Sequence, residues 1–390
     1  MGNLQASRLG ATALADPIDD IGALADHQYR QAEATCRLSD EVYDRSIAGG
    51  LYRQIVPDGS GTADDLVEWF DNSVRAAFWD GSFGWVIAQG AYVTAAIHVA
   101  SPDLAARLED HDGFPVAATN AGVLDGRPVG DGKYSLTGSV PFNSGCDGAA
   151  GMMVQFAMSD RRPGRSALRM AYAPADQWKI VRDWDVTGLR GTGSHSMVAD
   201  GLVVDVADVI NQFGPAEVEG PTRVLAMGEN GSWPIAAAVA ATQLGIARRA
   251  LDEAYVVAKT KKAPPLFDLL DDRPTVRRDL MEAEGRWHQA ISSVRAALAD
   301  AWETGLDDET LSDAQRATLS TATYLANRDS AEIVDRVARV VGTSSLRSDH
   351  PIARCSRDVR PLLGHVASND AVLGFAAARW REEDPRNIIV

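Results

Sequence analysis

The spacing of apolar residues divides the chain into three segments. In residues 21–107 the apolar positions follow a helical period, and Ala-rich stretches such as residues 88–100 lack the alternation of a strand. Residues 116–209 contain short runs with a different period, and helical spacing returns after Pro234. This order of helices, strands and helices predicts an α+β fold that is mainly α.

The middle segment has the pattern of short strands joined by turns. Gly130-Asp131-Gly132 predicts a tight hairpin, because alternating side chains follow it from Lys133 to Gly138. Further runs at residues 152–158, 167–173 and 197–206 are separated by connections rich in Gly, Pro, Asp or Arg. The segment is therefore predicted to form a small antiparallel barrel or sandwich.

The last segment has the apolar stripes of long helices. The clearest stripe begins after Pro274, a residue suited to a helix N-terminus. It consists of Val276, Leu280, Ala283, Trp287, Ile291, Val294, Leu298 and Ala301. An earlier helix around residues 244–254, a later one around 322–341 and a fourth over 360–379 complete a predicted antiparallel four-helix bundle. The predicted domains are an N-terminal helical domain (1–113), a middle β-domain (114–215) and the bundle (216–390).

Composition narrows the class of protein. The net charge of −16 argues against nucleic acid, since no excess of Lys and Arg is available to neutralise phosphates. Cys36, Cys146 and Cys355 lie far apart without a CxxC pair, which argues against a disulfide framework or a metal site and favours a reducing cytoplasm. No signal peptide and no apolar stretch approaching ~20 residues is expected, so a cytoplasmic protein without a membrane span is predicted.

Three local motifs resemble the acyl-CoA dehydrogenase superfamily. They are Trp184-Asp185-Val186-Thr187-Gly188-Leu189-Arg190-Gly191-Thr192-Gly193-Ser194, Gly245-Ile246-Ala247-Arg248-Arg249-Ala250-Leu251-Asp252-Glu253-Ala254, and Pro351-Ile352-Ala353-Arg354-Cys355-Ser356-Arg357-Asp358. The glycine-rich run lacks the G-x-G-x-x-G spacing of a dinucleotide fingerprint and, taken alone, is a turn. Their co-occurrence in order over residues 25–380 carries the resemblance. It implies an acyl-CoA dehydrogenase-like fold with a middle antiparallel β-domain, assembled as a homotetramer.

The resemblance separates two kinds of flavin chemistry. Dehydrogenases of this superfamily need a carboxylate base, placed either on the last helix or on the first bundle helix. The corresponding positions here are Val366 and Ile235, and neither side chain can accept a proton. A register shifted by one residue would place His365 at the first position instead, and this residue is not the family's base either. The dehydrogenase interpretation is therefore weakened.

The better match is to the flavin-dependent monooxygenases that share the fold. They carry a Phe-x-Ser-Gly-Cys stretch, which here is Phe142-Asn143-Ser144-Gly145-Cys146, and a His on the last helix, which here is His365. The resemblance implies that Ser144 hydrogen-bonds near flavin N5 and the C4a-hydroperoxide. It also implies that His365 acts as an acid, base or hydrogen-bond donor, a role suited to a His that titrates near neutrality.

The same resemblance implies the cofactor and partners. The enzyme would use reduced FAD or FMN and O₂ to oxygenate a small organic substrate, aromatic or amine. No NAD(P)H fingerprint is visible in the sequence, so a separate reductase is expected to supply the reduced flavin. The alternatives are a flavin dehydrogenase or oxidase with another base, and a non-redox scaffold that keeps the fold.

Other positions complete the expected cofactor site, each with a simpler structural alternative. The resemblance implies flavin contacts from Arg190, Thr192, Ser194 and, at the end of the first bundle helix, from Lys261. Ser144 could instead stabilise a turn, and His365 could be structural. Further expectations concern residues outside these motifs. His195 is predicted to lie in a loop near the cofactor, and Cys146 to be a small buried residue rather than a nucleophile. Five aromatic residues could line a pocket or belong to the core: Trp79, Phe83, Trp85, Tyr92 and Trp233.

Overall fold

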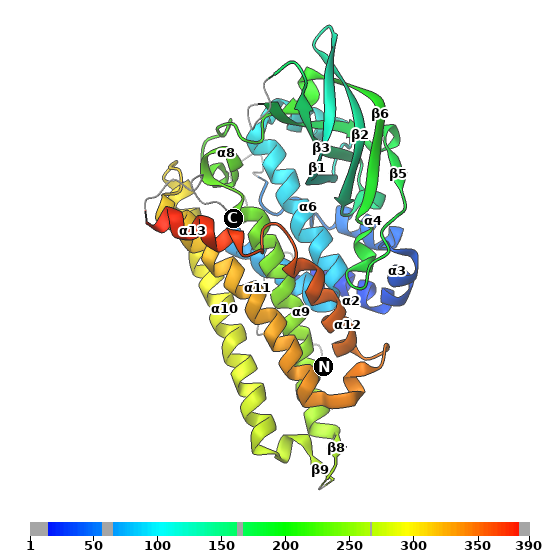
Figure 1. The fold of residues 1–390 in the computed structure, drawn as a ribbon, viewed down its shortest axis with the longest axis vertical. Coiled ribbons are helices and arrows are strands. Elements are labelled where there is room, and N and C mark those ends of the chain that lie inside the picture. The colour runs from blue at the N-terminus through cyan, green and yellow to red at the C-terminus, as the bar shows by residue number, and fades with distance from the viewer. Residues whose placement is uncertain (1–14, 57–64, 162–166, 266, 382–390) are drawn as a thin grey trace.

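The computed structural model describes residues 15–56, 65–161, 167–265 and 267–381 (Figure 1). A first group of helices is followed by a β-domain at one end of the molecule and then by long helices that extend to the opposite end. The first group comprises α2 (Ala15–His27), α3 (Tyr29–Thr35), α4 (Asp40–Ala48), α5 (Leu66–Trp79), α6 (Gly81–Ala100) and α7 (Pro102–Asp110). The mainly helical α+β fold predicted from the sequence is thereby confirmed.

The β-domain is a seven-stranded sheet with the order β5-β6-β2-β1-β3-β4-β7. Its strands are β1 (Val116–Gly130), β2 (Lys133–Asn143), β3 (Gly151–Met158), β4 (Leu168–Pro174), β5 (Lys179–Val181), β6 (His195–Asp205) and β7 (Val209–Ile210). The predicted hairpin is confirmed, because Gly130 pairs with Lys133 and both Asp131 and Gly132 have positive φ, as a type I′ turn requires.

The expectation of a wholly antiparallel barrel or sandwich is wrong in one respect. β3 pairs with β1 in parallel, whereas the other strand pairs of the sheet are antiparallel. After β2, the chain turns at Cys146–Gly148 and returns beside the free edge of β1, where Val116 pairs with Gly151. Alternation along a strand shows which face is buried but not the direction of its neighbour, so this pairing was not predictable from the pattern.

The long helices behave as their apolar stripes predict. They are α9 (Trp233–Thr260), α10 (Pro274–Leu306) and α11 (Asp313–Val341), followed by the shorter α12 (Pro351–Leu363) and α13 (Ala371–Trp380). A short helix, α8 (Met227–Asn230), precedes them. A small hairpin of β8 (Lys262–Ala263) and β9 (Asp268–Leu269) joins α9 to α10. Pro274 is at the start of α10, and every member of its predicted stripe is buried. Trp287 of α10 also donates a hydrogen bond through Nε1 to the Leu244 carbonyl of α9 at 2.9 Å.

The predicted single helix over residues 360–379 is wrong. α12 ends at Leu363, and α13 begins at Ala371. Pro361 and Gly364 weaken helix continuation, and the Ser368 hydroxyl and the His365 backbone N–H both donate to the Leu362 carbonyl, at 2.8 and 3.2 Å. His365, which the sequence analysis placed on the last helix, therefore lies in a turn between two helices.

The α6 helix lies in the centre of the fold, between the β-domain and the long helices (Figure 1). It is 20 residues long and apolar enough to cross a membrane, so the sequence-based expectation that no stretch approaches this length was wrong. Most of it is buried within the protein, in the position of a core helix. Many of its apolar residues, from Trp85 to Val99, share one hydrophobic cluster with those of α5, α9, α10 and α11, so the first and last helical groups have a common core.

Candidate functional site

Two segments far apart in the sequence lie side by side at the end of the sheet nearest α6. The Gly145 N–H donates to the Thr192 carbonyl at 2.8 Å, and the Cys146 thiol donates to the Gly193 carbonyl at 3.2 Å. Asn143 pairs with His195 across β2 and β6, and its Nδ2 donates to the His195 carbonyl at 2.9 Å. The predicted Phe142–Cys146 and Thr192–Ser194 motifs therefore form one structural unit, here called the β wall (residues 142–147 and 192–195).

Phe142 has an unusual backbone in this wall. Its φ is 62°, a region in which a bulky residue is strained, and it lies where the register between β2 and β6 shifts. The side chain is 55% exposed and meets the Trp184 ring edge-on at 5.9 Å between centroids. The strained bulge thus exposes an aromatic surface next to buried polar groups, which is typical of a binding site.

Three buried hydroxyl groups form a row within the β wall. Ser144 Oγ lies 2.7 Å from Ser194 Oγ, which lies 2.7 Å from Thr192 Oγ1. Thr192 in turn donates to the Leu189 carbonyl at 2.8 Å. Ser144, Ser194 and Thr192 are therefore brought together as predicted, but through contacts with one another.

Trp85 of α6 connects this row to the other predicted catalytic residue. Its Nε1 donates to Ser144 Oγ at 2.9 Å, and its ring contacts the His365 imidazole edge-on, with centroids 5.5 Å apart. Ser82 and Val86, on the same face of α6, lie against Gly191 and Gly145. Trp85 was only one of five aromatic candidates in the sequence, because helical spacing cannot distinguish a core aromatic residue from one that joins two site residues.

His365 lies in the turn after α12 and not on the predicted last helix. Its Nδ1 accepts a hydrogen bond from the Ala367 backbone N–H at 3.1 Å, so the proton of the neutral ring is on Nε2. Burial lowers the pKa of His365 to about 4. The expectation of a His that titrates near neutrality is therefore wrong: His365 is a neutral residue with an Nε2–H donor, and Nε2 makes no hydrogen bond to any residue that the structure describes.

A charged cluster is centred on two residues of the β wall, Asp147 and His195. Asp147 is buried, accepts a hydrogen bond from Arg182 at 2.7 Å, and lies 3.7 Å from His195 Nε2 and 3.9 Å from Arg37 Nε. Burial lowers the pKa of His195, although the Asp147 carboxylate opposes this shift. His195 begins β6 and is buried, so its prediction as a loop residue was wrong.

Cys146 is the buried thiol that the sequence analysis predicted. It is 2% exposed, and burial raises its pKa to about 12, with a further increase from the neighbouring Asp147 carboxylate. A thiol with this pKa is not a nucleophile at neutral pH, so its predicted role as a small packing residue is confirmed.

The glycine-rich segment before the β wall is held against α12. The Leu189 N–H donates to Asp358 Oδ1 at 2.7 Å, and burial together with the nearby Asp80 raises the pKa of Asp358 to about 7. A Cβ on Gly188 would lie 2.1 Å from the Arg357 carbonyl oxygen, so only glycine allows this approach. The Arg-Asp pair of the sequence motif thus positions the segment that carries Thr192 and Ser194.

Two other predicted cofactor residues make contacts outside this group. Arg190 donates to the Glu33 and Val186 carbonyls and to Asp185, at 2.7, 2.6 and 2.7 Å. Lys261 Nζ donates to the Val341 carbonyl at 2.6 Å and to Ser344 Oγ at 2.8 Å. Both side chains connect structural elements of the chain, and neither contacts Ser144 or His365.

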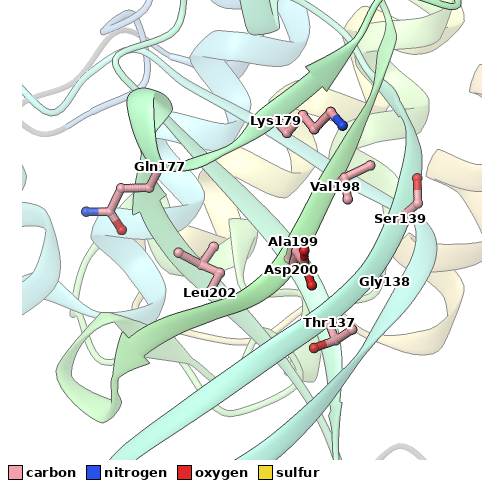
Figure 2. Close-up of a pocket in the computed structure, with 9 residues that line it drawn as sticks. All are labelled: Thr137, Gly138, Ser139, Gln177, Lys179, Val198, Ala199, Asp200 and Leu202. Atoms are coloured by element: carbon pink, nitrogen blue, oxygen red, sulfur yellow. The ribbon is translucent and has the colours of Figure 1, made fainter.

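The outer surface of the sheet has a separate open groove of about 550 Å³ (Figure 2). It is lined by residues of β2, β5 and β6 together with Gln177, and it contains none of the predicted catalytic or cofactor residues. No aromatic side chain lines it, so it offers no stacking surface for a flavin ring.

Comparisons with known proteins agree with the fold. Residues 237–370 match the family described as "Acyl-CoA dehydrogenase, C-terminal domain". Indole-3-acetate monooxygenase of Pseudomonas putida is 26% identical, over 96% of this chain and 93% of the relative. The flavin-dependent monooxygenase oxygenase subunit HsaA of Rhodococcus jostii is 22% identical, over 87% of this chain and 90% of the relative.

Solved structures share the architecture over nearly the whole chain. XiaF from Streptomyces sp., in complex with FADH₂ and glycerol, has a TM-score of 0.84 at 19% identity and covers 97% of both chains. FMN-bound TdsC from Paenibacillus sp. A11-2 has a TM-score of 0.78 at 20% identity, over 95% of this chain and 98% of that one. These structural relatives bind FADH₂ or FMN.

The fold and the site together define the class. The chain has an acyl-CoA dehydrogenase-like fold, its residues 237–370 match the C-terminal domain of that family, and its named relatives include flavin-dependent monooxygenases. Homology to the oxygenase components of such systems is distant, and it indicates a flavin-dependent oxidoreductase.

Proposed function

We propose that this protein is the oxygenase component of a two-component flavin-dependent monooxygenase. The observation that carries the proposal is the placement of Ser144 and His365 on the same tryptophan, Trp85. The alternative base positions, Val366 and Ile235, hold side chains that cannot remove a proton, which argues against dehydrogenation. The proposed reaction consumes substrate, O₂ and reduced flavin and yields oxygenated substrate, water and oxidised flavin.

The residues present fit the ring of a flavin. Phe142 and the half-buried Trp184 offer an aromatic surface, and the Ser144 hydroxyl is an anchored polar group nearby. Phe142, Trp184 and Ser144 include no charged side chain that could bind the cofactor phosphates. Lys261, the residue expected to do so, is hydrogen-bonded to Val341 and Ser344 of the same chain. We extend the proposal to a homotetramer in which Lys261 serves a neighbouring subunit, and sedimentation of the purified protein would test the assembly.

Bound reduced flavin would supply the two electrons that activate O₂. Within the protein, Ser144 would orient the flavin, and the His365 Nε2–H would donate a hydrogen bond to the developing negative charge on oxygen or on substrate. Trp85 would fix the separation of these two groups. The apolar residues of α6 would exclude water, which favours transfer of oxygen to substrate over release of hydrogen peroxide.

A direct experiment is to mix the anaerobic protein and reduced FMN or FAD with isotopically labelled O₂ and a panel of small aromatic compounds and amines. Indole-3-acetate would be the first compound, because one relative is an indole-3-acetate monooxygenase. Incorporation of one labelled atom into product supports the proposal. Reduction of oxidised flavin by an acyl-CoA would support a dehydrogenase instead, and failure to bind either flavin would support a scaffold.

The reductase can be tested separately. We expect the pure protein with added oxidised flavin to leave NADH unconsumed, and addition of an NADH-dependent flavin reductase to restore oxygen uptake. Rapid NADH oxidation by the protein alone would contradict the two-component assignment.

A further inference from the structure

The hydroxyl row of the β wall has a direction that the hydrogen-bond partners determine. The Leu189 carbonyl can only accept, so Thr192 must use its single hydroxyl proton to donate to it at 2.8 Å. Thr192 Oγ1 can then only accept from Ser194, at 2.7 Å. Ser194 in turn can only accept from Ser144, also at 2.7 Å.

This direction decides what Ser144 can offer a ligand. Its proton is committed to Ser194, and one of its two acceptor positions takes the Trp85 Nε1–H at 2.9 Å. One acceptor position is left. Ser144 is therefore prepared to accept a hydrogen bond from a bound group, and it can donate one only if the row of hydroxyls reverses.

The distinction matters for a flavin because its N5 changes role with oxidation state. Reduced flavin carries a hydrogen at N5 and donates, whereas oxidised flavin presents a lone pair there. An acceptor opposite N5 matches the reduced form and opposes the oxidised form, since two lone pairs would face each other.

We infer that Ser194 and Thr192 act as positioning residues that make the site selective for reduced over oxidised flavin, by fixing Ser144 as a hydrogen-bond acceptor. This inference rests on the proposed function, because it takes Ser144 to face flavin N5. It assigns to Thr192 and Ser194 an effect exerted through Ser144 and not through their own contact with the cofactor. The same selectivity would expel oxidised flavin after turnover and so assist exchange with a reductase.

The test measures the dissociation constant of oxidised FMN divided by that of reduced FMN, and the same ratio for FAD. Binding of the reduced form is measured without oxygen. We expect the unmodified protein to bind reduced flavin more tightly. Ser194→Ala removes the group to which Ser144 donates, so Ser144 can turn its proton to N5, and the ratio should fall about tenfold, the scale of one hydrogen bond. Thr192→Val should shift the ratio in the same direction by a smaller factor, because Ser194 could then either donate to Ser144 or continue to accept from it.

Trp85→Phe is the matched control at the same hydroxyl. It removes a donor to Ser144 but leaves the Ser144 proton directed at Ser194, so the ratio should change less than about twofold. Thermal unfolding of each variant shows whether it is folded, and Ser194→Cys, a weak hydrogen-bond acceptor, replaces Ser194→Ala if that variant unfolds. The inference fails if Ser194→Ala and Trp85→Phe change the ratio equally, or if neither changes it.

Failure of the proposed function gives a different result. In that case the unmodified protein would bind neither form of flavin, or would transfer no oxygen to any substrate. A protein that oxygenates substrate but shows an unchanged ratio in Ser194→Ala would retain the proposed function and lose only the inference.

Discussion

The β wall and the turn that carries His365 contact the same tryptophan but are built differently. In the β wall, Ser144, Ser194 and Thr192 satisfy one another through buried hydrogen bonds. The His365 turn lies between two helices; Val366 is 73% exposed, and the imidazole is held by one hydrogen bond from Ala367 and the edge of Trp85. One side of the site is therefore held by several mutual hydrogen bonds before any ligand binds, whereas the other is held by few contacts.

This difference separates stability from catalysis. Replacing a group in a packed, mutually bonded wall should affect the free energy of unfolding, since partners lose their hydrogen bonds. Replacing a half-buried donor in a turn should affect the reaction, because its Nε2–H has no partner among the described residues. The predictions below test this separation, beginning with the largest expected effect.

His365→Ala should lower turnover about 10²-fold, the scale for loss of one positioned donor. His365→Asn, which can donate without titrating, should recover about tenfold of that loss. Both variants should keep an unfolding free energy within about 1 kcal/mol of the unmodified protein. Steady-state turnover with saturating reduced flavin is the measurement. Normal turnover in His365→Ala would remove this residue from the mechanism.

Asp147→Asn should lower the free energy of unfolding by about 2 kcal/mol, because it removes a buried carboxylate that faces Arg182, Arg37 and His195. The loss should be smaller than the usual cost of breaking a buried ion pair, because the Arg182 side chain is 57% exposed. Asp185→Asn is the control, since the Asp185 side chain is 90% exposed and should contribute less than about 0.5 kcal/mol. If the two variants lose the same free energy of unfolding in urea denaturation, the charged contacts of Asp147 do not stabilise the β wall as predicted.

Ser144→Ala should increase the fraction of consumed O₂ that is released as hydrogen peroxide by a few-fold, with a stability loss of about 1 kcal/mol. In the proposed function its hydroxyl faces the flavin, so the cost should appear in coupling more than in folding. Oxygen uptake and product would be measured together. Unchanged coupling would make Ser144 a structural residue of the turn.

The pH dependence of stability should show two opposing contributions. His365, with its pKa lowered to about 4, binds fewer protons when folded, so its contribution to stability decreases as pH falls from about 6.5 towards 4. Asp358, with its pKa raised to about 7, binds more protons when folded, so its contribution decreases as pH rises from about 4 towards 7.

The two slopes nearly cancel in the unmodified protein and can be separated by mutation. His365→Asn should become less stable as pH rises over this range, and Asp358→Asn should become more stable. Urea denaturation at several pH values between about 4.5 and 7 is the measurement. Parallel curves for both variants would contradict the opposing contributions.

The sequence by itself determined much of the architecture. Periodic apolar residues after Pro274 predicted α10, and Gly130-Asp131-Gly132 predicted the hairpin between β1 and β2, because both signals depend only on neighbouring residues. The resemblance of residues 142–146 to a family motif predicted one side of the candidate site.

The tertiary structure alone decided the parallel pairing of β1 with β3, the break after Leu363, the role of Trp85 and the neutral state of His365. A local pattern reports which face of an element is buried but not what it is buried against. Strand direction, the path of a hydrogen-bonded proton and the desolvation of an imidazole all depend on residues distant in the sequence. They are therefore fixed only when the chain has folded.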